Sequence, residues 1–296
     1  MTVQANSDSW PRISVVIPAL NEARNLPYLF ARLPAVLHEV ILVDGRSEDD
    51  TIAVAQALRP GIRIVKQTRR GKGNALACGF AAATGDIIAM VDADGSADPG
   101  EIPAFVKALL NGADFAKGTR FGHEKAGSAD LTRLRSLGNR ALSFLVNVIY
   151  NTRYSDLCYG YNAFWREILP VLGLSASPPP GRTGTVSQPS GMPWGDGFEV
   201  ETLINIRVAI AGLAVTEVPS FEHPRIHGVS NLNVLADGLR VLRAIFSEYS
   251  RSRHRPARDR AWAVRSPASR AGALRPGPPP ASADHAPESV GEEIRR

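Results

Sequence analysis

The chain has 296 residues, of which 44% are hydrophobic and 21% charged, an ordinary composition for a globular protein. This length is enough for one α/β domain with a sizeable core, or for two domains at most. No run approaches the roughly 18 to 20 apolar residues of a membrane helix, and residues 1–11 lack the features of a signal peptide. The two cysteines, Cys78 and Cys158, match no metal-binding spacing and fit free thiols in a reducing compartment. We therefore expect a cytoplasmic protein with a flexible N-terminus.

The net charge of +5 comes from one end of the chain. Ten arginines and five acids lie between residues 251 and 296, whereas the rest of the chain carries as many acids as bases. The same segment is rich in proline and poor in large apolar side chains, so it cannot bury enough surface to offset its ordering entropy. We expect a disordered, solvated tail at 251–296 and no nucleic-acid partner, although its Arg-rich start could also contact anionic lipid.

Short β-branched runs alternate with segments of helical periodicity over the first part of the chain. The runs predict strands at 13–17, 40–43, 63–65 and 87–92, and the periodic segments predict helices at 22–33, 51–58 and 75–83. Asn21 stands where the first helix would have its N-cap. Such alternation indicates a single doubly wound, mostly parallel sheet, with functional groups at the carboxyl ends of its strands.

The fourth expected strand runs directly into two carboxylates, Asp92 and Asp94. Because side chains alternate along a strand, both would lie on the same side at its end. Two neighbouring carboxylates repel each other unless a cation or a proton compensates, and Mg²⁺ typically takes one or two protein carboxylates together with substrate phosphates. The stretch alone fits a metal site and, equally, an ordinary turn at Asp94-Gly95.

Two further polar residues, Asp44 and Lys72, fall at the same expected edge of the sheet. The Gly71-Lys72-Gly73 loop lacks the spacing of a P-loop, and no G-x-G-x-x-G follows the first strand. A P-loop kinase and a Rossmann dehydrogenase are therefore poor fits. Taken alone, Lys72 is better explained as a solvated loop cation.

Four segments, in this order, resemble the family-2 glycosyltransferases: residues 18–22, 43–51, 71–75 and 92–94. The resemblance extends over residues 13–247. It implies the A-type nucleotide-sugar fold, an inverting transfer from a nucleotide sugar, and Mg²⁺ or Mn²⁺ as cofactor. We expect one domain at 12–250, with the nucleotide-sugar half at 12–98 and the acceptor half at 99–250.

The resemblance also implies roles for residues that follow the strands. Those implied to bind the donor are Pro18, Asn21, Glu22, Asp44, Lys72 and Asp92. Asp44 would accept a hydrogen bond from the base, and Lys72 would lie near the base or ribose. Asp92 and Asp94 would hold the metal and the diphosphate, which makes Asp94 a catalytic candidate. The family often has a second acid after Asp44, and because Gly45 stands there instead, the base stays unassigned.

The second half of the chain carries arginines beside apolar segments. Residues 154–164 and 217–231 resemble the polyprenyl-phosphate sugar transferases. The arginines that this resemblance implies for the acceptor and donor phosphates are Arg120, Arg133, Arg135 and Arg225. Their planar guanidinium groups suit bidentate pairing with phosphate. Of the four, Arg225 is also a catalytic candidate.

The segment 131–150 is basic at its start and almost wholly apolar afterwards. It fits a core helix, but beside a phosphate-handling site such a helix could lie at a membrane surface. The helix expected at 232–249 has an apolar stripe that could likewise face the core or a membrane. The resemblance thus leaves two locations open, the cytoplasm and the inner face of the membrane.

The chemistry of the acceptor decides whether a catalytic base is needed. A lipid monophosphate has a second pKa of about 6, so it is already a nucleophile at neutral pH. A hydroxyl acceptor needs a carboxylate within reach, for which Asp196 is the candidate unless it caps the helix that runs on to Ile210. Glu201 fits a structural role better. Residues 175–193 predict a mobile loop.

We expect transfer to a polyprenyl phosphate, with transfer to a soluble hydroxyl acceptor as the alternative. From another class, a nucleotidyltransferase shares a similar sheet and carboxylate–metal chemistry. Against it, no Gly-rich loop with a basic residue follows the first strand. A non-catalytic nucleotide-binding module would require both acids, Asp92 and Asp94, to be idle.

Overall fold

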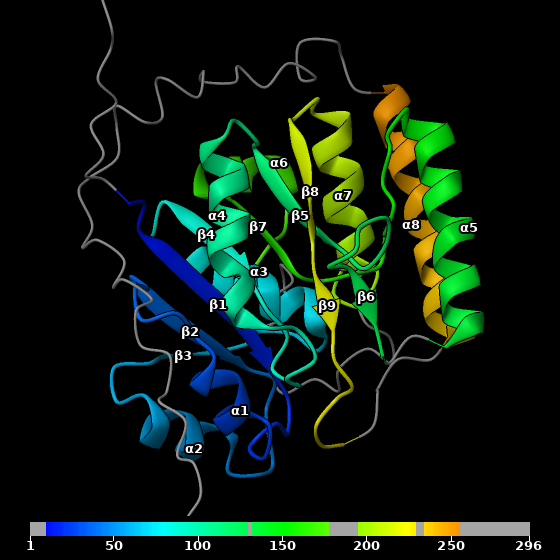
Figure 1. Ribbon diagram of the computed structural model, residues 1–296. Helices are drawn as coiled ribbons and strands as arrows, with labels where there is room; N and C mark the ends of the chain where they lie inside the picture. Colours follow the sequence, from blue (N-terminus) through cyan, green and yellow to red (C-terminus); the bar gives the residue numbers. More distant parts are fainter. Residues whose placement is uncertain (1–9, 130–131, 178–194, 229–233, 255–296) are drawn as a thin grey trace, which may run out of the picture.

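The computed structural model describes residues 10–129, 132–177, 195–228 and 234–254 (Figure 1). The segments expected to be flexible, at 1–11, 175–193 and 251–296, lie for the most part outside these ranges. Within the described ranges, no helix is long and apolar enough to cross a membrane.

A seven-stranded sheet forms the centre of the molecule, in the order β3-β2-β1-β4-β7-β5-β8. Its strands are β1 (Ile13–Ala19), β2 (Glu39–Asp44), β3 (Arg63–Lys66), β4 (Ile87–Met90), β5 (Phe115–Thr119), β7 (Asn162–Trp165) and β8 (Val215–Pro219). Neighbouring strands are parallel except that β7 runs antiparallel between β4 and β5. The expected mostly parallel α/β sheet is confirmed. The antiparallel β7 was not predicted.

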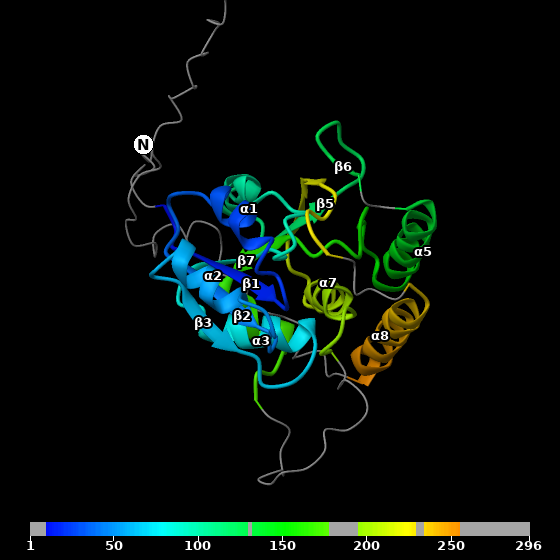
Figure 2. The ribbon, with the colours of Figure 1, turned by 90° about the horizontal axis from the view of Figure 1, so that it is seen from below.

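Helices cover the sheet, and two long helices stand beyond them. The helices are α1 (Leu26–Ala31), α2 (Thr51–Leu58), α3 (Lys72–Ala82), α4 (Ile102–Leu110), α5 (Arg133–Tyr150), α6 (Leu169–Leu172), α7 (Val200–Ile210) and α8 (Val234–His254), with short 3₁₀ turns at Pro99–Glu101 and Arg166–Ile168. Two short strands, β6 (Gly127–Ser128) and β9 (Phe221–Glu222), form a separate pair. α3 and α4 pack on the sheet, whereas α5 and α8 lie side by side next to α7 (Figures 1 and 2).

Several helices begin or end at residues other than those predicted. α1 begins at Leu26, because Asn21 has φ 57°, in the left-handed region, and cannot be its N-cap. α3 begins earlier, at Lys72. α8 continues to His254, beyond the domain end expected at residue 250.

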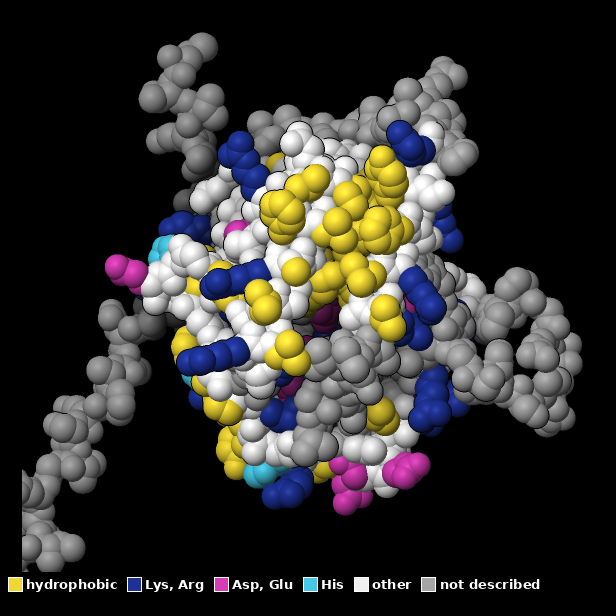
Figure 3. All heavy atoms as spheres, turned by 90° about the vertical axis from the view of Figure 1, so that its right-hand side faces the viewer, with side chains coloured by type: hydrophobic (Ala, Val, Ile, Leu, Met, Phe, Trp, Pro, Cys, Tyr) yellow, Lys and Arg dark blue, Asp and Glu magenta, His cyan; other side chains and the backbone are white. Residues whose placement is uncertain are grey.

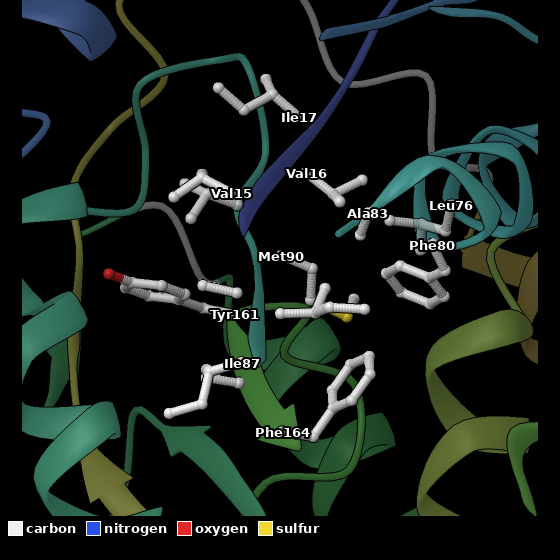
Figure 4. Close-up of a cluster of buried hydrophobic side chains, with 14 of the residues drawn as sticks. Val15, Val16, Ile17, Leu76, Phe80, Ala83, Ile87, Met90, Tyr161 and Phe164 are labelled. Carbon is white, nitrogen blue, oxygen red and sulfur yellow. The ribbon is translucent and has the colours of Figure 1, made fainter. Parts of the chain in front are cut away.

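The main core lies between the sheet and the helices on its faces (Figure 4). Val15, Val16 and Ile17 of β1 are fully buried, since helices cover both faces of this parallel part of the sheet. Phe80 of α3 meets Phe164 of β7 edge to face, with ring centroids 5.2 Å apart. Burial of each such side chain stabilises the fold by about 1.5–3 kcal/mol.

A second, smaller apolar cluster holds α5 and α8 to α7. Val146 of α5, Ile206 of α7 and Ile245 of α8 are fully buried there. The Tyr150 hydroxyl donates to the carbonyl oxygen of Ile245 at 2.6 Å. One side of α5 therefore packs in this cluster, whereas other apolar residues of the helix are exposed.

Gly73 makes a very close contact between α3 and the loop before α7. A Cβ atom placed on Gly73 would lie 1.8 Å from the carbonyl oxygen of Gly195, and the Gly73 amide donates to the Asp196 carbonyl at 2.8 Å. We predict that Gly73→Ala lowers the free energy of unfolding by about 1–3 kcal/mol, because the two backbones must move apart. Urea unfolding measures this change.

Gly138 on α5 provides the matched control, since a Cβ there would meet nothing within 4 Å. Gly138→Ala should stabilise the protein by about 0.5–1 kcal/mol, the usual gain for glycine to alanine in a helix. Equal effects of the two substitutions would contradict the importance of the Gly73 contact.

Candidate functional site

The loop after β1 is held to the loop after β2 through Asn21, and Asp44 fixes the second of these loops from within. The Asn21 amide donates to Ser47 Oγ at 3.0 Å, and Asn21 Oδ1 accepts from the Glu48 amide at 2.8 Å. Asp44 is buried at the end of β2, and its carboxylate accepts from the backbone amides of Arg46 and Ser47, both at 3.1 Å. Pro18, Asn21 and Asp44 therefore lie at the edge where β1 and β2 end, and their role in donor binding stays a prediction.

Gly45, which stands where the family often has an acid, is packed against the neighbouring loop. Its amide donates to the Ala19 carbonyl at 2.7 Å, and a Cβ on Gly45 would lie 3.0 Å from that carbonyl oxygen and 3.1 Å from Leu20 Cβ. A side chain at this position would crowd the loop after β1. The glycine thus permits the two loops to approach closely.

Lys72 joins the two halves of the site. Its Nζ lies 2.7 Å from Asp92 Oδ1 and 2.6 Å from Glu201 Oε1. Although burial alone would lower it, the two carboxylates hold the pKa of Lys72 above its usual value. Lys72 is therefore not a solvated loop cation. Glu201, which fitted a structural role from the sequence, contacts the same ammonium group as the predicted metal ligand.

Arg225 makes the corresponding connection for the second acid. Its Nη2 lies 2.9 Å from Asp94 Oδ2 and its Nη1 lies 3.4 Å from Glu22 Oε1. Asp94 Oδ1 accepts from the amide and the hydroxyl of Ser96 at 3.0 and 2.8 Å. Burial is the main cause that raises the pKa of Glu22, and repulsion by Asp94 and Asp92 adds to it.

The loop that carries Arg225 is fixed to the donor half at both ends. The His223 amide donates to the Ser96 carbonyl at 2.8 Å. The His227 amide donates to Asn25 Oδ1 at 3.0 Å, and Asn25 Nδ2 donates back to the His227 carbonyl at 3.1 Å. Arg225 is thereby held over the acids even though it lies about 200 residues from Glu22 in the sequence.

The donor set of Asp92 and Asp94 fits a hard divalent cation. Carboxylate oxygens are the protein ligands that Mg²⁺ takes together with substrate phosphates. The described ranges contain no group of three or more His, Cys, Asp and Glu side chains arranged for a metal, so a cation here would need further ligands from a substrate. Because Lys72 and Arg225 now neutralise the two acids, such a cation would replace them as partners.

Asp196 is buried in an ion pair with Arg69. Arg69 Nε donates to Asp196 Oδ2 at 2.7 Å and Arg69 Nη2 to Oδ1 at 2.8 Å. This pairing raises the pKa of the guanidinium. Asp196 does not cap α7, because the N-cap residue is Glu199, whose carboxylate accepts from Arg240 and from the Gly195 amide. The expected alternative, a helix cap, is wrong.

Arg120 is also buried and fully paired. Its Nε and Nη2 donate to Asp156 at 2.7 and 2.9 Å, its Nη1 donates to Glu222 at 2.9 Å, and it lies 4.8 Å from the ring centroid of Tyr159. Despite burial, which acts in the opposite direction, the hydrogen bonds from Arg120 hold the pKa of Asp156 below its usual range. Each of the three guanidinium nitrogens of Arg120 thus donates to a carboxylate of the protein.

A pocket of about 430 Å³ opens beside Arg120 at the start of α5. It is lined by Arg120, Phe121, Ser128, Arg133, Ser136, Leu137 and Arg140. Arg133 and Arg140 are exposed, and neither pairs with an acid among the residues that the structure describes. Arg140 was missed in the sequence, although its position two helical turns after Arg133 puts both on one side of α5. Arg135 does not line the pocket.

The sequence and the fold are both similar to those of known proteins. The family model "Glycosyl transferase family 2" matches residues 14–173. The chain belongs to this family. The predicted A-type fold is confirmed by crystal structures of glucosyl-3-phosphoglycerate synthase from Mycobacterium tuberculosis. One, in complex with phosphoglyceric acid, has a TM-score of 0.60 at 26% identity, covering 81% of this chain and 80% of that one.

Further structures of that synthase hold Mg²⁺ and uridine diphosphate, with a TM-score of 0.59 at 25% identity, over 81% of this chain and 80% of that one. Another holds Mn²⁺, uridine-diphosphate-glucose and phosphoglyceric acid, with a TM-score of 0.60 at 26% identity and the same coverage.

Among curated relatives, an uncharacterized glycosyltransferase of Mycobacterium tuberculosis is 44% identical over 108 residues, 36% of this chain and 48% of the relative. The dolichol-phosphate mannosyltransferase of Pyrococcus furiosus is 36% identical over 117 residues, 37% of this chain and 33% of the relative. A hexosyltransferase of low-salt glycan biosynthesis from Haloferax volcanii is 27% identical over 249 residues, 82% of this chain and 55% of the relative. The chain thus matches about half or less of the length of these relatives.

The pairing of Arg120 predicts a structural rather than a ligand-binding role. Arg120→Met should lower the free energy of unfolding by about 3–5 kcal/mol, because Asp156 and Glu222 would be left buried without their cation. Arg140→Met is the matched control and should change it by less than about 0.5 kcal/mol. Urea unfolding at neutral pH gives both values, and a small effect at Arg120 would contradict the structural role.

The deficit of Arg120→Met should also depend on pH. In the wild type the lowered pKa of Asp156 contributes stability that is present above the unfolded pKa of about 3.9 and is lost as pH falls through the folded pKa. In the variant Asp156 becomes protonated more readily. The difference in unfolding free energy between the two proteins should therefore shrink as the pH falls from neutral to below about 4, and a constant difference would argue against this pairing.

Proposed function

We propose that this protein transfers a sugar, with inversion, from a nucleotide sugar to the phosphate of a polyprenyl phosphate. The observation that carries the proposal is the pocket at the start of α5, whose arginines Arg133 and Arg140 are exposed and form no ion pair with a described residue, while Arg140 lies 5.6 Å from the ring centroid of Phe121. Two guanidinium groups that face an open pocket suit an anionic group such as a phosphate monoester. Arg120 lines the same pocket, but its charge is already compensated by Asp156 and Glu222.

At the donor side, Pro18, Asn21, Glu22 and Asp44 would surround the nucleotide. Lys72 and Arg225 now neutralise Asp92 and Asp94. When a nucleotide sugar binds, both cations lie where they can turn from these acids to the diphosphate oxygens. Glu201 would keep Lys72 in place after Asp92 has changed partners. Mg²⁺ or Mn²⁺ held by Asp92 and Asp94 would stabilise the negative charge of the departing diphosphate.

At the acceptor side, the proposed reaction needs no protein base. A phosphate monoester with a second pKa of about 6 is ionised at neutral pH, and its oxygen can attack the anomeric carbon opposite the leaving group. Asp196 is committed to Arg69 by two hydrogen bonds, and to serve as a base it would have to give up this pairing. This arrangement favours a phosphate acceptor over a hydroxyl acceptor.

A soluble acceptor that carries both a phosphate and a hydroxyl group is a second candidate, because glucosyl-3-phosphoglycerate synthase has been crystallised with phosphoglyceric acid. In that case the hydroxyl would be the nucleophile and Asp196 the candidate base. The pocket on α5 has the charge to hold either kind of phosphate. The two candidates differ in the solubility of the product, which makes them separable by experiment.

Substitution of Asp94 tests the proposed donor site. Asp94→Asn should reduce sugar transfer by at least about a hundredfold, because the site would lose one of the two charges that hold the metal and diphosphate. Radiolabelled nucleotide sugars with Mg²⁺ or Mn²⁺ measure transfer, after thermal-shift screening of UDP, GDP and dTDP sugars has identified the donor. Release of nucleoside diphosphate is expected, whereas pyrophosphate would indicate a nucleotidyltransferase.

The control for this substitution is Asp98→Asn. Asp98 caps the turn at Pro99–Glu101 by accepting from the Gly100 amide, and asparagine can accept the same bond. Both variants should unfold at temperatures close to the wild type. Full activity of Asp94→Asn in a metal-dependent assay would overturn the assignment of this acid.

Substitution of Arg133 and Arg140 tests the proposed acceptor. With a short-chain polyprenyl phosphate, label should move into organic solvent, and the double variant Arg133→Gln/Arg140→Gln should raise KM for this acceptor by at least about tenfold. KM for the nucleotide sugar should stay unchanged. Arg153→Gln, at an exposed arginine outside the pocket, is the control. If label is transferred to phosphoglyceric acid but never to polyprenyl phosphate, so that no label enters the organic phase, the polyprenyl phosphate is wrong as acceptor and the soluble candidate takes its place.

A further inference from the structure

Two neighbouring helices present large apolar side chains to solvent on one side of the molecule (Figure 3). On α5 these are Leu134, Leu137, Phe144 and Val148, with 64 to 71% of each side chain's residue surface exposed. On α8 they are Leu239, Phe246 and Tyr249, at 58, 55 and 37%. We call these seven residues the helical face. Monomeric proteins rarely expose contiguous apolar patches of this kind unless something binds there.

The spacing of the helical face is that of a regular helical stripe. Its residues on α5 follow one another after three, seven and four positions, with the exposed Ala141 completing the alternation of three and four. On α8 the half-buried Leu242 completes the same alternation between Leu239 and Phe246. Apolar residues at this spacing form a continuous line along a helix and normally pack against a partner.

α5 is oriented opposite to a usual surface helix. Its buried side includes the polar residues Asn139 and Ser143. Asn139 Nδ2 donates to Asp156 at 2.9 Å, and Ser143 Oγ accepts from the Leu157 amide at 3.1 Å. These hydrogen bonds, together with the buried Val146, fix the rotation of α5 about its axis. The stripe of apolar residues on the opposite side consequently faces out because of specific contacts, and not because the helix is loosely placed.

The charges around the helical face are positive. α5 contains three arginines and no acid. α8 contains four arginines and two acids. Arg240 is paired with Glu199 and Arg251 with Glu248, which leaves Arg243 and Arg253 of α8 outside these ion pairs. In Figure 3, dark blue side chains lie around the yellow ones. A partner with apolar material bordered by negative charge would complement this surface.

We propose that the helical face binds the surface of a bilayer that contains anionic lipids. The apolar side chains would enter the boundary between headgroups and acyl chains, and the arginines would pair with lipid phosphates. A second copy of the chain fits less well, because the arginines of the two copies would meet with little acidic surface to compensate them. A bilayer without anionic lipids has no net negative charge to attract the arginines.

The pocket at the start of α5 opens at the edge of this face, since Leu137 belongs to both. If the proposed function holds, a phosphate in the pocket would have its polyprenyl chain beside the apolar stripe. Membrane binding itself requires neither donor nor acceptor. The two proposals can therefore fail separately.

The test is flotation of the full chain with vesicles, without any substrate. We expect binding to vesicles of phosphatidylcholine mixed with phosphatidylglycerol, and little binding to phosphatidylcholine alone. The double variant Phe144→Ser/Phe246→Ser should bind at least about tenfold more weakly, because two large side chains no longer enter the lipid. Arg243→Gln, at an exposed arginine of α8, should bind about fivefold more weakly, and high salt should weaken the wild type.

Leu58→Ser is the matched control, because Leu58 is 45% exposed but lies on α2, away from the helical face. The Arg-rich segment after residue 254 is identical in every variant, so binding through that segment would survive in Phe144→Ser/Phe246→Ser and overturn the proposal. Equal binding to neutral and anionic vesicles would overturn it too. If the wild type sediments as a dimer and does not bind vesicles, and Phe144→Ser/Phe246→Ser sediments as a monomer, the helical face binds a second copy of the chain instead.

An assay of sugar transfer distinguishes membrane binding by the helical face from the proposed function. Phe144 and Phe246 do not line the pocket or the proposed donor site, so Phe144→Ser/Phe246→Ser should keep its transfer to a water-soluble phosphate acceptor, which has no chain to place beside the apolar stripe. Vesicle binding by a wild-type protein that transfers no sugar to lipid would uphold the helical face and overturn the proposed acceptor.

Discussion

Ion pairing between cations and carboxylates at the edge of the sheet organises the whole site. Parallel strands bring their carboxyl ends, and with them Asp92 and Asp94, to one edge where like charges repel. Lys72 and Arg225 reach these acids from opposite directions, and each also bridges to the other half of the chain, through Glu201 and Glu22. The ion pairs that hold the halves together are thus the ones that an anionic donor would have to rearrange, which couples ligand binding to the position of the loop after β9.

The arginines divide into two groups that differ in burial and in use. Arg120 is buried and Arg69 is partly buried, and each is bidentate to a buried aspartate, so they hold the framework. Arg133 and Arg140 are exposed beside an open pocket, where an anion would meet their guanidinium groups without first breaking an ion pair. This division, rather than the number of arginines, decides which of them can serve a substrate.

Much of the fold could be predicted because the strands of the first half are continuous β-branched runs, and the acids at their ends were recognisable at the same time. β7 was missed because it is short and its direction depends on β4 and β5, on either side of it. The site was harder. The pairing of Asp196 with Arg69 spans 127 residues and that of Arg120 with Asp156 spans 36, and no local pattern in a sequence specifies contacts of such separation. Arg140 was missed because the apolar residues around it suggested a core helix.

The reversal of β7 has a consequence for how such a protein can change. β5 and β7 are adjacent in the sheet and antiparallel, so the chain leaves the sheet after Thr119 and returns beside the same strand at Asn162. Residues 120–161, which include α5 and the residues that line the pocket, form one long connection between these two antiparallel strands. Residues of this segment that hold the framework, such as Asp156, are constrained by their contacts, whereas the exposed positions that line the pocket can vary without altering the register of β2 and β4. If the proposed function holds, acceptor preference can thereby evolve on an unchanged donor scaffold.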